Sequence, residues 1–335
     1  MSTLQQFGND TSTAEIVDYS VSNWQTRVTP SNGATSGRGI AWNGTLFAAT
    51  DSGATNRVMT SPDGITWTAR ATADETKFWA GIAWNGTVFV TVNQGAAGEG
   101  AMTSPDGITW TLRATSSSGD QWNGIAWNGT VFAAVGNNVV MTSPDGITWT
   151  ARTAAAANNW FGIAWNGTVF AAVAASGAGN RVMTSPDGIT WTIRTSADDN
   201  NWFNIAWNGT VFAAVAGSGA GNRVMTSPDG ITWTSRTSAA DNSWRGIAWN
   251  GTVFCAVSID GSGNRLMTSP DGITWTIRTS SAGDARWFAI AWNGLGTGTT
   301  LLLPAAGSGT VFAAHGDNTS TSNVMTNLFY KRDAT

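Results

Sequence analysis

The chain carries little charge and few of the residue types on which most enzymes depend. Charged residues make up 11% of its 335 residues, and the formal net charge is −4. The two lysines are Lys77 and Lys331, so no basic stripe could follow a phosphate backbone, and nucleic acid is not an expected partner. The single cysteine, Cys255, excludes an intrachain disulfide and a cysteine-based metal site. We therefore expect neither a metal nor a cofactor.

Long apolar runs are also missing. The longest, from Leu301 to Ala306, is far too short to cross a bilayer. The first ten residues, MSTLQQFGND, have neither the basic start nor the apolar stretch of a Sec signal. These features predict a soluble protein without membrane insertion. It would stay in the cytoplasm or leave the cell by a route that needs no signal, such as inside a phage particle.

What is abundant is glycine, tryptophan and a repeated string. The chain has 40 glycines and 20 tryptophans, which with its low charge fits an all-β protein with many tight turns. The string I-A-W-N-G recurs about every 42 residues, at Trp42, Trp84, Trp127, Trp165, Trp207, Trp249 and Trp292. A fixed period of this length is typical of a repeat architecture.

One repeat, residues 159–195, contains the signals for four short strands. The expected strands are residues 160–165, 168–173, 180–184 and 189–194. Asn166-Gly167 separates the first two and is a strong two-residue hairpin signal. Ser-Pro-Asp-Gly at 185–188 supplies the turn before the fourth strand. Four strands in about 42 residues correspond to one propeller blade. Cys255 replaces an alanine of the other repeats and is expected to be a small core residue.

The markers of the repeat predict a seven-bladed β-propeller with four strands per blade. The chain begins with an outer strand, residues 23–28, and ends with a third strand, residues 322–327, which should pair and close the ring. The expected organisation is an N-terminal arm at 1–20, one propeller at 21–329 and a tail at 330–335. The last blade differs by an extended hairpin loop at 295–309.

The string Thr-Ser-Pro-Asp-Gly-Ile-Thr-Trp resembles the Asp-box repeat of sialidase-like propellers, shortened by one residue between Asp and Trp. Similar W-N-G-T-x-F and S-P-D-G-x-x-W repeats recur in phage and bacterial surface proteins. In Asp-box families the motif is a structural turn away from the active face. The resemblance therefore implies that six aspartates are turn residues and not catalysts: Asp63, Asp106, Asp145, Asp187, Asp229 and Asp271.

Candidate catalytic groups are sparse. The two tyrosines, Tyr19 and Tyr330, lie in the terminal segments, so a sialidase-type nucleophile is not expected inside a blade. Asp198 and Asp199 are paired by adjacency only, and a loop cap accounts for them as well as paired-carboxylate hydrolysis does. The sole histidine, His315, reads as a packed or rim residue rather than a member of a triad. We therefore predict that the protein is not an enzyme.

The loops that join an outer strand to the next inner strand suggest a carbohydrate-binding rim. Each ends in a tryptophan preceded by Asn, Asp or Gln, and aromatic faces with neighbouring amides or carboxylates suit sugar rings and hydroxyls. The candidate residues are Trp79, Trp122, Trp160, Trp202, Trp244 and Trp287, with Asp120, Asn159, Asn201, Asn242 and Asp284. The alternative, of equal weight, is that these tryptophans wedge between blades as core.

The loop at 295–309 holds the leucines Leu301, Leu302 and Leu303, which suggest an anchoring contact with another chain. The N-terminal arm is either a docking strap or a disordered terminus. Together these features predict a non-enzymatic phage virion component, a capsid decoration or a tail-associated receptor-binding subunit that recognises surface glycans and contacts other virion proteins through the arm and the loop. The alternatives are a soluble multivalent bacterial lectin on a cell surface or secreted, and a sialidase-like glycosidase.

Overall fold

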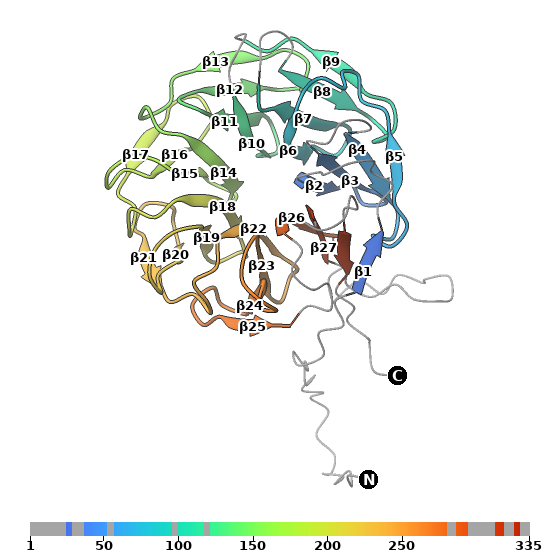
Figure 1. The fold of residues 1–335 in the computed structure, drawn as a ribbon. Coiled ribbons are helices and arrows are strands. Elements are labelled where there is room, and N and C mark those ends of the chain that lie inside the picture. The colour runs from blue at the N-terminus through green and yellow to red at the C-terminus, as the bar shows by residue number, and fades with distance from the viewer. Residues whose placement is uncertain are drawn as a thin grey trace, which may run out of the picture.

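The computed structural model describes residues 25–28, 37–51, 57–95, 100–116, 121–279, 286–293, 312–317 and 325–328. In these ranges the chain forms 28 strands, which make seven four-stranded antiparallel sheets arranged around one central axis (Figure 1). No helix long and apolar enough to cross a membrane occurs in this part of the chain. The expected arm at 1–20, the loop at 295–309 and the tail at 330–335 lie outside the described residues.

Six of the sheets each use four consecutive strands, ordered from the axis outward. The first two are β2 (Gly37–Trp42), β3 (Phe47–Asp51), β4 (Val58–Ser61), β5 (Thr68–Arg70), then β6 (Trp79–Trp84), β7 (Phe89–Asn93), β8 (Ala101–Ser104), β9 (Thr111–Arg113). The next two are β10 (Trp122–Trp127), β11 (Phe132–Gly136), β12 (Val140–Ser143), β13 (Thr150–Arg152), then β14 (Trp160–Trp165), β15 (Phe170–Ala174), β16 (Val182–Ser185), β17 (Thr192–Arg194). The last two are β18 (Trp202–Trp207), β19 (Phe212–Ala216), β20 (Val224–Ser227), β21 (Thr234–Arg236), then β22 (Trp244–Trp249), β23 (Phe254–Ser258), β24 (Leu266–Ser269), β25 (Thr276–Arg278).

The predicted count of seven blades is corrected to six blades of four consecutive strands. The remaining four strands form a composite sheet in the order β1–β28–β27–β26, which joins the two ends of the chain. Its strands are β1 (Gln25–Val28), β28 (Met325–Leu328), β27 (Phe312–Asp317) and β26 (Arg286–Trp292). The string I-A-W-N-G occurs seven times because β26 of this sheet also leads into it, but Ser-Pro-Asp-Gly occurs six times, and no such turn connects β1 to its partner β28. The innermost strand, β26, lies against β2 on one side and β22 on the other and so completes the ring.

The core lies between adjacent sheets. The second strand of each blade is buried along its whole length, as in β15, because neighbouring sheets cover both of its faces. Within a blade the rings are layered: Trp165 lies 4.7 Å from Phe170, and Phe170 lies 6.2 Å from Trp191, measured between ring centroids. Cys255 is fully buried, as predicted for a small core residue, and burial raises the pKa of its thiol.

Two side-chain-capped turns shape every continuous blade. In the fourth blade the Asn166 side-chain oxygen accepts hydrogen bonds from the amides of Thr168 and Val169, at 2.8 and 2.7 Å. The carboxylate of Asp187 accepts hydrogen bonds from the amides of Ile189 and Thr190, at 2.8 and 3.1 Å. These contacts satisfy backbone donors that the turns leave without ladder partners. Each of the six Asp-box-like aspartates binds its own turn in this way: Asp63, Asp106, Asp145, Asp187, Asp229 and Asp271.

These six turns predict a loss of stability in acid. Burial is the largest single influence on five of the carboxylates and opposes ionisation, but the hydrogen bonds together outweigh it, so their pKa is lowered. At Asp187 the hydrogen bond from the Ile189 amide is the largest cause of the lowered pKa. Because the folded-state pKa lies below the unfolded one, about 3.9, the contribution is complete above that pH and is lost as pH falls through the folded-state value.

We therefore expect urea unfolding to show a constant free energy between pH 7 and about pH 5, followed by a progressive decline towards pH 2. Asp187→Asn, which keeps an oxygen acceptor and cannot titrate, should be less stable at pH 7 and should show a smaller decline. A free energy of unfolding that stays level from pH 5 to pH 2 would contradict this account of the turns.

Candidate functional site

The predicted tryptophan rim is corrected by the structure, because these side chains are core. Five of them have no exposed surface and the sixth, Trp122, is 1% exposed. Trp160 packs against Ala133 and Val135 of the preceding blade, and its indole N–H donates to the Ala156 carbonyl oxygen at 3.2 Å. A buried ring cannot stack on a sugar, so none of the six offers a carbohydrate platform: Trp79, Trp122, Trp160, Trp202, Trp244 and Trp287.

The polar residues beside these tryptophans fasten loops. The Asn242 amide nitrogen donates to the Asn264 carbonyl oxygen at 2.8 Å, and the Asn201 side-chain oxygen accepts from Arg181 Nη1 at 3.0 Å. Asp199 caps the loop before β16 through the amide of Gly179, at 2.6 Å. Asn159 differs from these residues because its side-chain oxygen accepts a hydrogen bond from Asn123, which lies at the axis. Asp120, Asp284 and the anchoring candidates Leu301, Leu302 and Leu303 lie outside the described residues.

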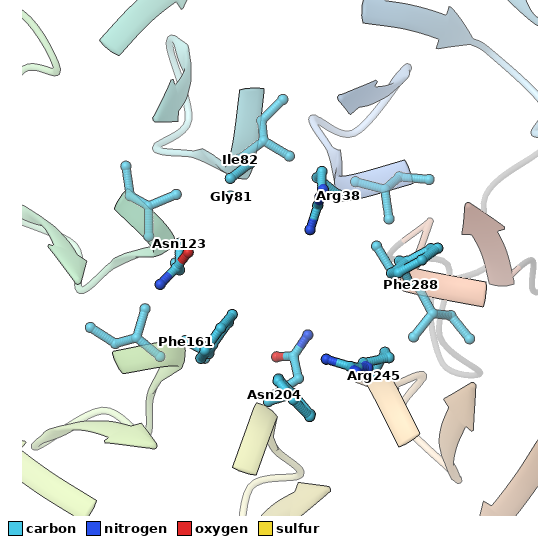
Figure 2. Close-up of a pocket in the computed structure, with 18 of the residues that line it drawn as sticks. Arg38, Gly81, Ile82, Asn123, Phe161, Asn204, Arg245 and Phe288 are labelled. Atoms are coloured by element: carbon cyan, nitrogen blue, oxygen red, sulfur yellow. The ribbon is translucent and has the colours of Figure 1, made fainter. Parts of the chain in front are cut away.

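The inner strands differ from one another at one position on the axis. It is the residue after the buried tryptophan of each inner strand, or after Gly37 in β2, whereas the Ile-Ala-Trp that ends the inner strand is the same in all seven sheets. The seven residues are Arg38, Ala80, Asn123, Phe161, Phe203, Arg245 and Phe288. They surround a central cavity of about 230 Å³ to which all seven inner strands contribute (Figure 2). We call these seven residues, together with Asn204, the channel mouth.

A β-bulge explains why this position faces the axis. In every sheet the register between the first and second strands shifts directly after the tryptophan or Gly37. In β10, for example, Trp122 pairs with Gly136 and Gly124 pairs with Val135, so Asn123 has no partner in the neighbouring strand. Bulges re-aim side chains in this way and are frequent beside functional sites. The position that varies among the inner strands is therefore the one that has no partner in the neighbouring strand.

Glycine follows the bulge in five of the seven sheets because neighbouring inner strands approach closely there. A Cβ on Gly124 would lie 2.1 Å from the Phe161 carbonyl oxygen, and one on Gly39 would lie 2.5 Å from the Ala80 carbonyl oxygen. Such distances exclude any side chain unless the backbone moves. β18 departs from this rule with Asn204, whose amide group turns into the channel (Figure 2).

Arginine and phenylalanine side chains dominate one half of the channel mouth. The Arg245 guanidinium carbon lies 3.6 Å from the centroid of the Phe203 ring, and Arg245 Nε is buried without a hydrogen-bond partner. Arg38 and Arg286 both approach the Phe288 ring, at 5.9 and 5.2 Å. Burial, followed by the like charges of Arg38 and Arg286, lowers the pKa of Arg245 to about 10, and the Asp260 carboxylate opposes this effect.

The other half of the channel mouth is neutral. Asn123 donates from its amide nitrogen to the Asn159 side-chain oxygen at 3.1 Å and to the Trp160 carbonyl oxygen at 2.8 Å, and accepts from Gln94. This network holds Asn123 at the axis. The Phe161 ring meets the edge of the Phe203 ring at a centroid distance of 5.1 Å. Figure 2 shows Asn123 and Phe161 across the cavity from Arg38 and Arg245.

The side chains that line the cavity supply guanidinium, amide and aromatic groups. Among the described residues that line the cavity there is no carboxylate, histidine, cysteine, hydroxyl or lysine side chain. The described part of the chain also contains no group of three histidine, cysteine, aspartate or glutamate side chains that could hold a metal ion. Guanidinium groups, amide groups and aromatic rings remain, and these orient a ligand through hydrogen bonds, charge and packing.

Comparison of the repeats could have located this site from the sequence. The informative residue is the variable one directly after the repeated tryptophan, and not the tryptophan itself. In the first repeat Gly37 stands at the tryptophan position, and Arg38 follows it. The bulge that turns this position inward has no sequence signal of its own beyond the glycine that follows it.

Known proteins share the fold of this chain. The family model for the DUF6242 beta propeller domain matches residues 70–203. No curated protein matches the chain at the sequence level. Among solved structures, a catalytically inactive virginiamycin B lyase from Staphylococcus aureus, with quinupristin, has a TM-score of 0.74 at 9% identity and covers 92% of this chain and 100% of its own. YCF48 bound to D1 peptide has a TM-score of 0.64 at 14% identity, over 92% and 95%. These likenesses identify a β-propeller.

Proposed function

We propose that this protein is a non-enzymatic binding propeller whose ligand enters the channel mouth. The observation that carries the proposal is that six of the seven bulged positions, which add nothing to the sheet ladders, hold arginine, asparagine or phenylalanine side chains, and the seventh holds Ala80. A purely structural role would not require arginines on β2 and β22 to converge on one cavity. Aromatic walls with a few placed polar groups are the usual composition of a ligand site.

A thermal-shift screen of the full chain against anionic and neutral small molecules and glycans tests this proposal. Hits at the channel mouth should disappear in Phe161→Ala, because this half-buried ring forms one wall of the cavity. The matched control is Ile147→Ala, since the Ile147 side chain is 48% exposed on a turn at the other end of the blade. Hits that persist in Phe161→Ala, or a screen without any hit, would count against a ligand site on the axis.

The biological setting belongs to the same proposal. We infer a phage virion component, a capsid decoration or a tail-associated receptor-binding subunit, from the resemblance of the repeats to Asp-box-like repeats of phage and bacterial surface proteins. Glycan recognition would then involve the channel mouth rather than the tryptophans. A soluble lectin would bind sugar as an isolated chain, and a glycosidase would need converging acids, which the described lining of the cavity lacks. Labelling of intact particles by an antibody against this chain would support the virion setting, and unlabelled particles would oppose it.

A further inference from the structure

Two hydrogen-bond donors at the channel mouth, one on Arg245 and one on Asn204, are available to a ligand. Arg245 Nε has no partner, and a guanidinium group can only donate. The Asn204 side-chain oxygen is occupied by the amide of Ile205 at 2.8 Å, and its amide nitrogen points into the channel (Figure 2). Asn123, by contrast, already uses both of its amide atoms in the network with Gln94, Asn159 and Trp160. A ligand that satisfies this set must be rich in acceptors.

The charge of the channel mouth selects an anion. Arg38, Arg245 and Arg286 lie on β2, β22 and β26, which are neighbours around the ring, and the like charges of Arg38 and Arg286 act on Arg245. The Asp260 carboxylate acts in the opposite sense and raises the pKa of Arg245. The whole chain carries a formal charge of −4, so the cationic cavity stands apart from the remainder of the molecule. An anion between Arg38 and Arg245 would relieve the repulsion, and low-dielectric walls would strengthen its attraction.

The shape of the site favours a carboxylate joined to a flat apolar group. A planar carboxylate matches the fork of a guanidinium group and can be held by two parallel hydrogen bonds. Phe161 and Phe288 provide aromatic walls, and the inner-strand isoleucines Ile82, Ile125 and Ile163 line the cavity beyond them. The volume of about 230 Å³ lies below the roughly 300–1,000 Å³ of drug-sized sites, so a single ring is the size that fits.

We infer that the channel mouth binds a small aromatic carboxylate, or the carboxyl end of a peptide that closes with an aromatic residue. The carboxylate contacts Arg245 and Arg38, the ring packs beside Phe161, and Asn204 donates to an acceptor such as an amide oxygen next to the ring. This inference rests on the proposed function and specifies its ligand. Both sources present the same chemistry, a carboxylate within a few bonds of an aromatic ring.

Calorimetric titration of the full chain with hippurate, an aromatic carboxylate with one internal amide, tests the inference. Hippuramide is the matched neutral probe, because it replaces only the carboxylate. We expect hippurate to bind and hippuramide to bind at least about tenfold more weakly, since charge-assisted bonds are roughly twice as strong as neutral ones. Equal affinity for the two probes would overturn the inference. A peptide ending in phenylalanine that binds more tightly than hippurate would identify a chain terminus as the source, and the reverse order a small molecule.

Two variants separate binding from folding. Arg245→Gln and the exposed Arg38→Gln should each weaken hippurate binding by about tenfold or more without reducing the melting temperature by more than a few degrees. The matched control, Arg236→Gln, removes an outer-strand arginine that bonds Thr226 and should leave hippurate binding unchanged. If Arg245→Gln unfolds the chain, the effect of Arg38→Gln on hippurate binding alone decides whether the inference holds.

Further probes distinguish the failure of this inference from failure of the proposed function. Glucuronate or inorganic phosphate that binds in an Arg38-dependent manner, while hippurate does not, would overturn the aromatic carboxylate and retain a ligand site. Glucuronate would then point to an acidic glycan. If none of these anions binds in an Arg38-dependent manner, both the inference and the anion-binding channel mouth are wrong.

Discussion

Replacement of Trp202 by alanine is expected to lower the free energy of unfolding by about 3–5 kcal/mol, the range for large aromatic side chains removed from a core. Trp202 has no exposed surface, and it packs between two blades, against Ala171 and Val173 of the preceding blade and Phe212 of its own. Its indole N–H also donates to the Asp198 carbonyl oxygen at 3.1 Å. The substitution leaves a cavity between two blades and an acceptor without its donor.

Urea unfolding monitored by circular dichroism measures this effect. The control is Ile231→Ala, because the Ile231 side chain is 47% exposed and its removal should change the free energy of unfolding by no more than about 0.5 kcal/mol. A Trp202→Ala protein as stable as the Ile231→Ala control would mean that the ring is not part of the core. Trp202 would then again be a candidate carbohydrate-binding residue.

Replacement of Gly124 by alanine is expected to destabilise the fold by about 2 kcal/mol or more, although only one methyl group is added. The new Cβ would lie 2.1 Å from the Phe161 carbonyl oxygen, which belongs to backbone and cannot rotate away. Strand β14 would have to move outward, and Phe161 would move with it. We therefore expect the stability and the ligand affinity of the channel mouth to fall together.

Asn204→Gly provides the matched control, because it restores at β18 the glycine that the other continuous blades carry at this position. It should fold with a stability close to that of the original chain and should lose only what the Asn204 amide contributes to binding. A Gly124→Ala protein with unchanged stability would show that the inner strands are less tightly packed than the Gly124–Phe161 approach indicates.

The order of strands could be predicted from the sequence because each turn has its own chemistry. Asn166-Gly167 and the Ser-Pro-Asp-Gly turn at Asp187 have fixed side-chain roles, and both occur where the repeat places them. The pairing of the two chain ends followed from the phase of the markers and is present as β1 against β28. The closing sheet differs from the six continuous blades because its outer strand comes from the N-terminal segment.

The direction of the side chains at the site could not be predicted in the same way, because burial and direction depend on packing between blades. Trp160 and Phe161 are adjacent aromatic residues of one strand. Trp160 is nevertheless buried between blades, whereas Phe161 lines the cavity. A simple alternation of faces does not distinguish inner surface from blade interface when both faces of a sheet are covered. The bulge after Trp160 decides the direction, and the close approach of β18 at Gly162 leaves no room for a side chain directly after Phe161.

The bulged residues take no part in strand pairing. Different sequence positions therefore determine the architecture of the propeller and the side chains that a ligand would contact. Tryptophan, glycine and the capped turns are repeated around the ring, whereas the seven adjacent positions hold side chains as different as Ala80 and Arg245. The seven positions can therefore vary without a change in strand pairing, although some of their side chains contact one another, as Arg245 contacts Phe203. A new set of side chains at these positions would change what the cavity accepts while the scaffold that presents them stays the same.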